Sequence, residues 1–184
     1  MNFSEIIEKH FDFLVSQFGY SKIPIDDTWI KYKLKQQSIV IIYDSKRSHE
    51  VSIFLEDETN IYNTIPFHVL CLAYGEPEQV KQLSCFFSQQ LPVIECYLEK
   101  ASIFIYEKMK PLLEGNQDEL QRAHDISLTE SQVYTQTRTD KVMREYAGEA
   151  WLNKDYARFL EIMNQAGFTL TDLDKRKIEF AKTR

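Results

Sequence analysis

The feature that most constrains this chain is a change of hydrophobic period near residue 30. Residues 30–35 alternate apolar side chains with lysines, the period-two pattern of a strand with one buried and one solvated face. Residues 39–43 are apolar on both parities, which is typical of a central strand. Another alternating segment, 50–56, follows a short polar stretch, and short connections favour antiparallel pairing. The sequence therefore predicts an antiparallel meander of three strands.

Helical periodicity lies on both sides of this sheet. Residues 3–18 place apolar side chains three and four positions apart and predict a helix that packs on the sheet. Residues 77–113 show similar spacing, with Phe86 and Phe87 in the predicted buried stripe. Pro92 interrupts this helix, because proline lacks the amide proton that a continuous helix needs. We therefore expect a break near residue 90.

The predicted fold class is α+β, with an N-terminal helix on a three- to four-stranded antiparallel sheet and a helical C-terminal half. Residues 1–113 form the α+β core with a long helix, and within them residues 65–73 fit either a short helix or a fourth strand. Residues 114–139 are rich in Gln, Asp, Ser and Thr and predict a linker-like segment with one or two short helices. Residues 140–184 predict a helical hairpin appendage with an added helix.

Charge and composition limit the partners. The net charge is −6, and residues 1–100 carry 14 acids against 9 bases. This acidic half argues against nucleic acid, which requires a basic surface, and permits a basic protein partner. No apolar stretch approaches the length of a membrane span, and the N-terminal residues lack the pattern of a signal peptide. We expect a cytoplasmic protein with no membrane segment.

The three cysteines are Cys71, Cys85 and Cys96. None belongs to a CxxC pair, and each has apolar or aromatic neighbours in the sequence. These features predict buried free thiols in a reducing compartment.

The sequence contains no recognisable catalytic motif. It has no GxGxxG or GxxxxGK[ST] glycine loop, no GxSxG elbow and no HExxH helix. The four histidines fall in different elements without ligand spacing, so we expect no metal and no cofactor. An enzyme would need a site assembled from scattered residues such as His68, Cys71 and Asp44.

Two polar clusters are candidate partner-binding sites. The acidic run Glu56-Asp57-Glu58 could bind a basic surface. The turn-like stretch that contains Asp44 and Arg47 is the densest polar cluster and the second candidate site.

Two stretches of the chain carry a resemblance to a known group of proteins. The first contains Phe18-Gly19-Tyr20, Trp29-Ile30-Lys31-Tyr32 and Val40-Ile41-Ile42-Tyr43-Asp44, and the second contains Tyr146-Ala147-Gly148-Glu149-Ala150-Trp151 and Lys177-Ile178-Glu179-Phe180. Together they resemble small, mostly uncharacterised bacterial proteins that are likened to toxin-immunity proteins. The resemblance implies a stoichiometric binder, with an acidic surface for a basic toxin domain, rather than a catalyst.

The sequence therefore favours a non-catalytic, cytoplasmic protein-binding module of immunity type that neutralises a toxin by occlusion. One alternative is an enzyme with the scattered site named above. Another is a structural or regulatory protein that oligomerises through its helical tail.

Overall fold

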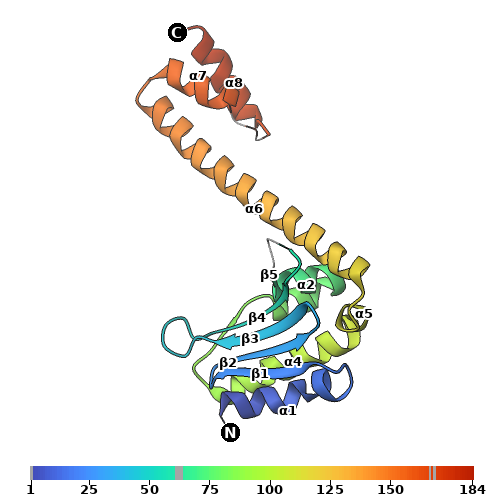
Figure 1. Cartoon of the computed structure of the whole chain (residues 1–184). Coiled ribbons are helices and arrows are strands. Elements are labelled where there is room, and N and C mark those ends of the chain that lie inside the picture. The colour runs from blue at the N-terminus through green and yellow to red at the C-terminus, as the bar shows by residue number, and fades with distance from the viewer. Residues whose placement is uncertain (1, 61–63, 166, 168) are drawn as a thin grey trace. The chain divides into compact units, whose positions relative to one another are not determined.

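The computed structural model describes residues 2–60, 64–165, 167 and 169–184 (Figure 1). These residues form an α+β fold, as predicted, with eight helices and a six-stranded antiparallel sheet. The strands are β1 (Ser21–Asp26), β2 (Trp29–Leu34), β3 (Gln37–Tyr43), β4 (Glu50–Asp57), β5 (Thr64–Pro66) and β6 (Phe86–Phe87). The helices are α1 (Phe3–Ser16), α2 (Phe67–Tyr74), α3 (Pro77–Leu83), α4 (Leu91–Lys108), α5 (Lys110–Leu113), α6 (Gln117–Leu152), α7 (Tyr156–Gln165) and α8 (Asp172–Lys182).

The sheet has the order β1-β2-β3-β4-β5, and β6 pairs with β4 beside β5. The three strands that the sequence predicts are β2, β3 and β4, and their antiparallel meander is confirmed. The sequence did not predict β1, which contains Pro24 and is almost entirely exposed. Proline is tolerated in β1 because an edge strand needs no donor on its outer side.

Helix α1 packs on the sheet through the apolar stripe that the sequence predicts. Asn2 caps its N-terminus in a reciprocal capping box with Glu5. Gly19 follows its C-terminus with a φ of 73°, a left-handed conformation that glycine adopts without the steric cost of a Cβ. The stripe is buried against the sheet, where the ring of Phe3 stacks on that of Tyr43 at 5.3 Å.

The break expected at Pro92 is confirmed. The segment 77–113 divides into α3, the short strand β6, α4 and α5, and Pro92 lies in the first turn of α4. A proline in the first turn of a helix loses no intrahelical hydrogen bond. The alternatives for residues 65–73 are also resolved, because the strand β5 ends at Pro66 and the helix α2 follows it.

The chain forms two compact units, residues 1–128 and 129–184, each with its own apolar core. The boundary falls inside α6, and this differs from the predicted linker: residues 117–139 are continuously helical. Every side chain from 128 to 139 is nevertheless exposed. The second unit buries α7 and α8 against the end of α6, and Thr171 caps α8 as its residue type predicts. None of the helices described is both long enough and apolar enough to cross a membrane.

Candidate functional site

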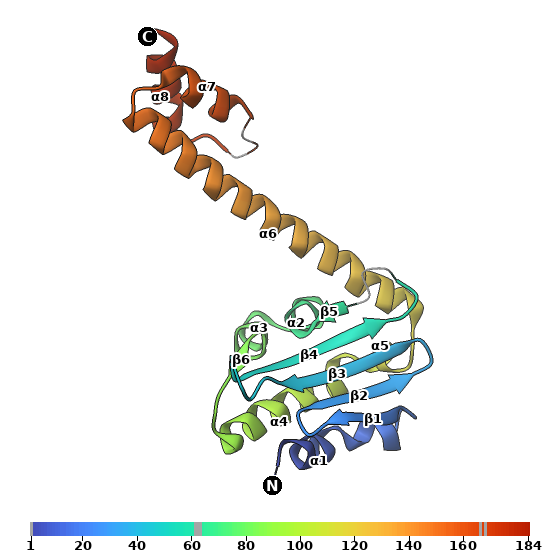
Figure 2. The same ribbon diagram turned by 60° about the vertical axis from the view of Figure 1, so that its left-hand side comes forward.

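The sheet of the first unit has two unlike faces. On one face, residues of a single parity in β2, β3 and β4 are buried beneath the helices; they are Ile30, Tyr32, Ile39, Ile41, Val51, Ile53 and Leu55. Side chains of the opposite parity lie on a face that none of the described helices covers (Figure 2), although Ser38 and Val40 of the central strand are fully buried on it. An antiparallel sheet commonly leaves one face to solvent, but that face is then expected to be polar.

One end of the uncovered face is apolar instead. Trp29 lies directly across from Ile42, and Phe87 of β6 lies directly across from Glu50 at the edge of β4. Trp29 is 39% exposed and Phe87 is 70% exposed. We call Trp29, Ile42, Phe87 and their neighbours on the same face, Ile23 and Phe54, the apolar strip.

Paired charges occupy the other end of the uncovered face. The ammonium of Lys31 lies 2.6 Å from the carboxylate of Glu56, and that of Lys33 lies 2.6 Å from the carboxylate of Glu58. The hydrogen bond from Lys33 lowers the pKa of Glu58. Two members of the predicted acidic run therefore lie on this face, but each is already neutralised by a lysine of the neighbouring strand.

The third member of that run, Asp57, points to the opposite side of the sheet. It continues the parity of Leu55, and its side chain is 5% exposed. Its carboxylate accepts hydrogen bonds from the amide and hydroxyl of Thr59, at 2.9 and 2.6 Å, and lies 3.0 Å from Nε2 of His124 on α6. Burial opposes ionisation, but the bonds from Thr59 and His124 outweigh it and lower the pKa of Asp57. Asp57 joins α6 to the sheet rather than facing a partner.

Asp44 and Arg47 lie in the loop between β3 and β4, two and five residues beyond Ile42 of the apolar strip. Oxygens of the Asp44 carboxylate accept the amide protons of Lys46, Arg47 and Ser48 at 3.1 to 3.4 Å. Although desolvation opposes it, these bonds lower the pKa of Asp44. Asp44 thus shapes the loop, and the Arg47 side chain is exposed.

A small hollow of about 200 Å³ lies at the edge of β4, where β5 and β6 leave a gap. β6 pairs with residues 50–51 and β5 with residues 54–56, so Ser52 and Ile53 have no neighbouring strand on that side among the described residues. Ser52 and Phe54 line the hollow together with His68. The hollow borders the apolar strip and extends the uncovered face to the sheet edge.

The structure does not assemble the scattered residues of the enzyme alternative. His68 is exposed on α2, whereas Cys71, one turn later, is fully buried. The hollow at His68 is lined by Cys85 rather than Cys71. Within the described residues there is no group of three or more His, Cys, Asp or Glu side chains that could hold a metal ion.

The cysteines differ from the expectation that all three are buried. Cys71 is buried, and desolvation raises its pKa to about 12. Cys85 and Cys96 are free thiols with exposed side chains. Their apolar sequence neighbours misled the prediction because Cys85 precedes a two-residue strand and Cys96 faces outward on α4.

We expect Ellman's reagent to modify two thiols in the native chain and the third only after unfolding. A thiol reacts as its thiolate, and both burial and a raised pKa suppress that form at Cys71. A Cys71→Ala variant should leave the native reaction at two thiols. Rapid reaction of three thiols in the folded protein would contradict the placement of Cys71.

Sequence reasoning missed the two most exposed anchors of the apolar strip for different reasons. For Trp29 a signal was present, because it shares the parity of Lys31 and Lys33, but the predicted strand began at Ile30 and left Trp29 out. Phe87 carried no such signal, since a two-residue strand has no period, and the predicted buried helical position is wrong.

Comparison with known proteins found no relative: no family model, no curated protein and no solved structure matches the chain.

Proposed function

We propose that the chain is a non-catalytic, cytoplasmic protein-binding module whose contact surface is the uncovered face of the sheet. The observation that carries this proposal is the exposure of Trp29 and Phe87 at one end of a sheet face that is otherwise neutralised by ion pairs. Large exposed aromatic side chains in one patch are typical of interaction sites.

The arrangement matches the anatomy of protein interfaces. Their centres are rich in Trp, Phe and Arg, whereas polar groups surround the rim. Here the apolar strip takes the centre, and the Lys31–Glu56 pair borders it, because Lys31 lies directly across from Ile23. The strip is carried by hydrogen-bonded strands, so little conformational entropy is lost when it binds.

The test is a capture experiment with the full chain from the cells that produce it. We expect a specific partner to be retained by the wild-type chain and lost by Trp29→Asp and by Phe87→Asp. With the partner purified, truncation of either anchor to alanine should weaken binding by about 2 kcal/mol, roughly thirtyfold.

The matched control is Val93→Asp on α4, where a side chain 43% exposed lies on the helix side of the sheet. It introduces the same charge at a similar exposure and should leave capture unchanged. Equal retention by the wild type and both strip variants would refute the sheet face as the contact surface. Equal loss of capture in Trp29→Asp, Phe87→Asp and the control Val93→Asp would also refute it.

Within this proposal, the partner is a toxin that the module neutralises by occlusion. The resemblance to immunity proteins supports this, as does the charge of the first unit, which has 19 acids and 12 bases. Its acidic excess favours a basic partner and speeds association. We expect the captured partner to arrest growth when expressed alone, with rescue by the wild-type chain but not by Trp29→Asp. If the captured partner does not arrest growth, the immunity role is rejected, but the proposal of a protein-binding module stands.

A further inference from the structure

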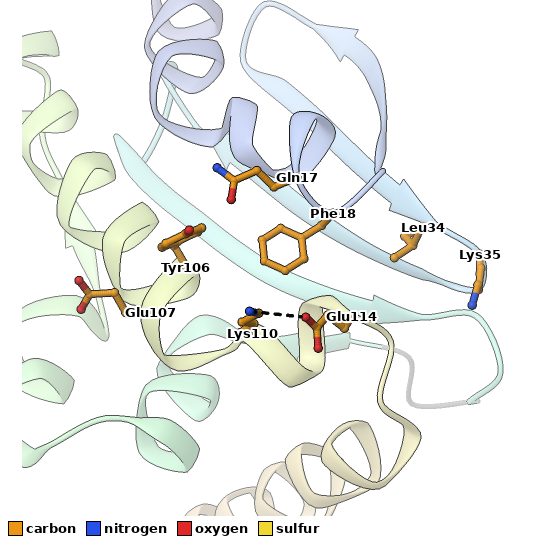
Figure 3. Close-up of a pocket in the computed structure, with 8 residues that line it drawn as sticks. All are labelled: Gln17, Phe18, Leu34, Lys35, Tyr106, Glu107, Lys110 and Glu114. Carbon is orange, nitrogen blue, oxygen red and sulfur yellow. Dashed lines mark ion pairs between the residues drawn. The ribbon is translucent and has the colours of Figure 1, made fainter.

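A hollow of about 680 Å³ in the first unit is lined by residues of α4, α5 and the ends of α1 and β2 (Figure 3). Its charged lining consists of two lysines and two glutamates, Lys35, Lys110, Glu107 and Glu114. Lys110 lies 3.9 Å from Glu114, and the positive and negative charges balance, so the hollow does not favour a charged ligand of either sign. The second unit, by contrast, carries an exposed surface on which the charges have a single sign.

This surface, which we call the basic ridge, runs along α8 and consists of Leu173, Arg176, Lys177, Phe180 and Arg184. The first four lie at relative positions zero, three, four and seven, a spacing that places them on one side of a helix. Arg184 follows the end of the helix, one turn after Phe180. Leu173 is 61% exposed and Phe180 is 42% exposed, so the ridge presents apolar groups as well as cations to solvent.

The acidic side chains of α8 are all paired with bases outside the basic ridge. The pairs are Asp172–Lys175 at 3.3 Å, Asp174–Arg144 at 3.0 Å and Glu179–Lys182 at 2.8 Å. Arg176, Lys177 and Arg184 have no ion-pair partner in the described part of the chain. The unneutralised side-chain charge of α8 is therefore positive and confined to the basic ridge.

Two of the three cations lie over aromatic rings. Nζ of Lys177 is 5.1 Å from the ring centroid of Trp151, and Cζ of Arg184 is 4.9 Å from that of Phe180. The rings of Trp151, Tyr156 and Phe180 contact one another with centroids 5.5 to 5.7 Å apart. Cation–π contacts restrain these side chains, and their N–H donors that point away from the rings remain available to a carboxylate. The ridge thus holds its cations beside exposed apolar groups.

This combination selects among the occupants that cations attract. Nucleic acids and anionic membranes respond to a broad positive field, whereas the second unit has 10 bases and 9 acids in total. A second copy bound symmetrically through the same ridge would bring cations against cations. Leu173 and Phe180 require apolar groups next to the anions, and an acidic amphipathic segment of a protein supplies both.

We infer that the basic ridge binds an acidic amphipathic segment of a partner protein. Carboxylates of that segment pair with Arg176, Lys177 and Arg184, and the arginines can each accept a carboxylate through two N–H groups. Apolar side chains of the segment contact Leu173 and Phe180. This site belongs to the second unit and is distinct from the apolar strip of the first, so its test does not depend on the proposed function.

The experiment titrates an acidic peptide into the isotopically labelled full chain and follows the backbone amide resonances of α8. The peptide has blocked termini and repeats the heptad Leu-Glu-Glu-Leu-Ala-Glu-Glu twice, which places its leucines on one side of a helix. We expect binding with a Kd on the order of 100 μM. The same peptide with glutamine in place of every glutamate should bind about tenfold more weakly, because it cannot form charge-assisted hydrogen bonds.

A charge-matched pair of double variants separates the basic ridge from the net charge. Arg176→Gln combined with Arg184→Gln should weaken binding of the acidic peptide about tenfold. Lys175→Gln combined with Lys182→Gln removes the same charge from the same helix but leaves the ridge intact, and should change the Kd by less than about twofold.

Three results would overturn the inference. The first is that no α8 resonance shifts with the acidic peptide, and the second is that the glutamine peptide binds equally well. The third is that the lysine double variant weakens binding as much as the arginine double variant. Tighter binding of α8 to a single-stranded oligothymidylate or to phosphatidylserine vesicles than to the peptide would also reject a protein segment as the occupant.

Discussion

We expect backbone amides of residues 129–139 to exchange with deuterated solvent orders of magnitude faster than those in the middle of α4. The two segments are both helical, but α4 buries Leu98, Ala101 and Ile105, whereas every side chain from 128 to 139 is exposed. A helix without tertiary packing depends on intrinsic propensity alone. Four of the eleven residues 129–139 are threonine, whose branched side chain is a poor helix former.

The exchange rate can be shifted without touching either core. Replacing Thr135, Thr137 and Thr139 by alanine should stabilise the helix by about 1.5 kcal/mol in total and slow local exchange about tenfold. Thr137→Gly is the opposing control and should accelerate it. Protection of residues 129–139 equal to that of α4, measured by exchange and mass spectrometry, would show that this part of α6 is stabilised by more than its own backbone.

The second large effect concerns the buried pair of Asp57 and His124. We expect His124→Ala to lower the free energy of unfolding of the first unit by about 2–3 kcal/mol, because among the described residues it leaves the buried carboxylate with the donors of Thr59 alone. Asp57→Ala should cost a similar amount, since His124 Nε2 then loses its acceptor. The double variant should cost less than the sum of the two, as coupled residues do.

The measurement is a urea titration in a Trp151→Phe background, so that the fluorescence of Trp29 reports the first unit alone. His68→Ala removes an exposed histidine of α2 and should stay within about 0.5 kcal/mol of the parent. Additive costs of the two single variants would contradict a direct interaction between Asp57 and His124.

The same pair predicts a pH dependence. The pKa of Asp57 is lower in the folded chain than in the unfolded one, so its contribution is fully present above the unfolded pKa of about 4. That contribution is lost as the pH falls through the lower, folded pKa. Between about pH 5 and pH 3, wild-type stability should therefore decline more steeply than that of Asp57→Ala.

Local sequence patterns predicted those elements that bury one face against the core. Alternation located β2 and β4, and the 3-to-4 spacing located α1, because in both cases one face is buried and the other is wet. Pro92 located the start of α4, because the cost of proline within a helix does not depend on tertiary context. The two helices of the predicted hairpin correspond to the end of α6 and to α7, and the added helix is α8; buried Phe159, Met163 and Ile178 belong to their shared core.

Elements without a buried face escaped prediction. β1 is exposed and β6 has two residues, so neither has a hydrophobic period, and both exist because β2 and β4 offer unpaired backbone groups at their edges. The composition of residues 114–139 favours a linker, yet 117–139 continue as helix between segments that are packed at each end. Propensity is a weak prior where neighbouring turns already fix the backbone.

For the candidate site, too, some features follow from the sequence and others from tertiary contacts. The sequence by itself determined which strand residues share a face, since parity is fixed by the pleat: it separates Asp57 from Glu56 and Glu58, and it places Trp29 with the lysines. Only the tertiary structure decided that Lys31 and Lys33 pair with Glu56 and Glu58, and that Phe87 reaches the same face from another segment. These features depend on contacts between residues that are distant in the chain, and a local sequence pattern does not predict such contacts.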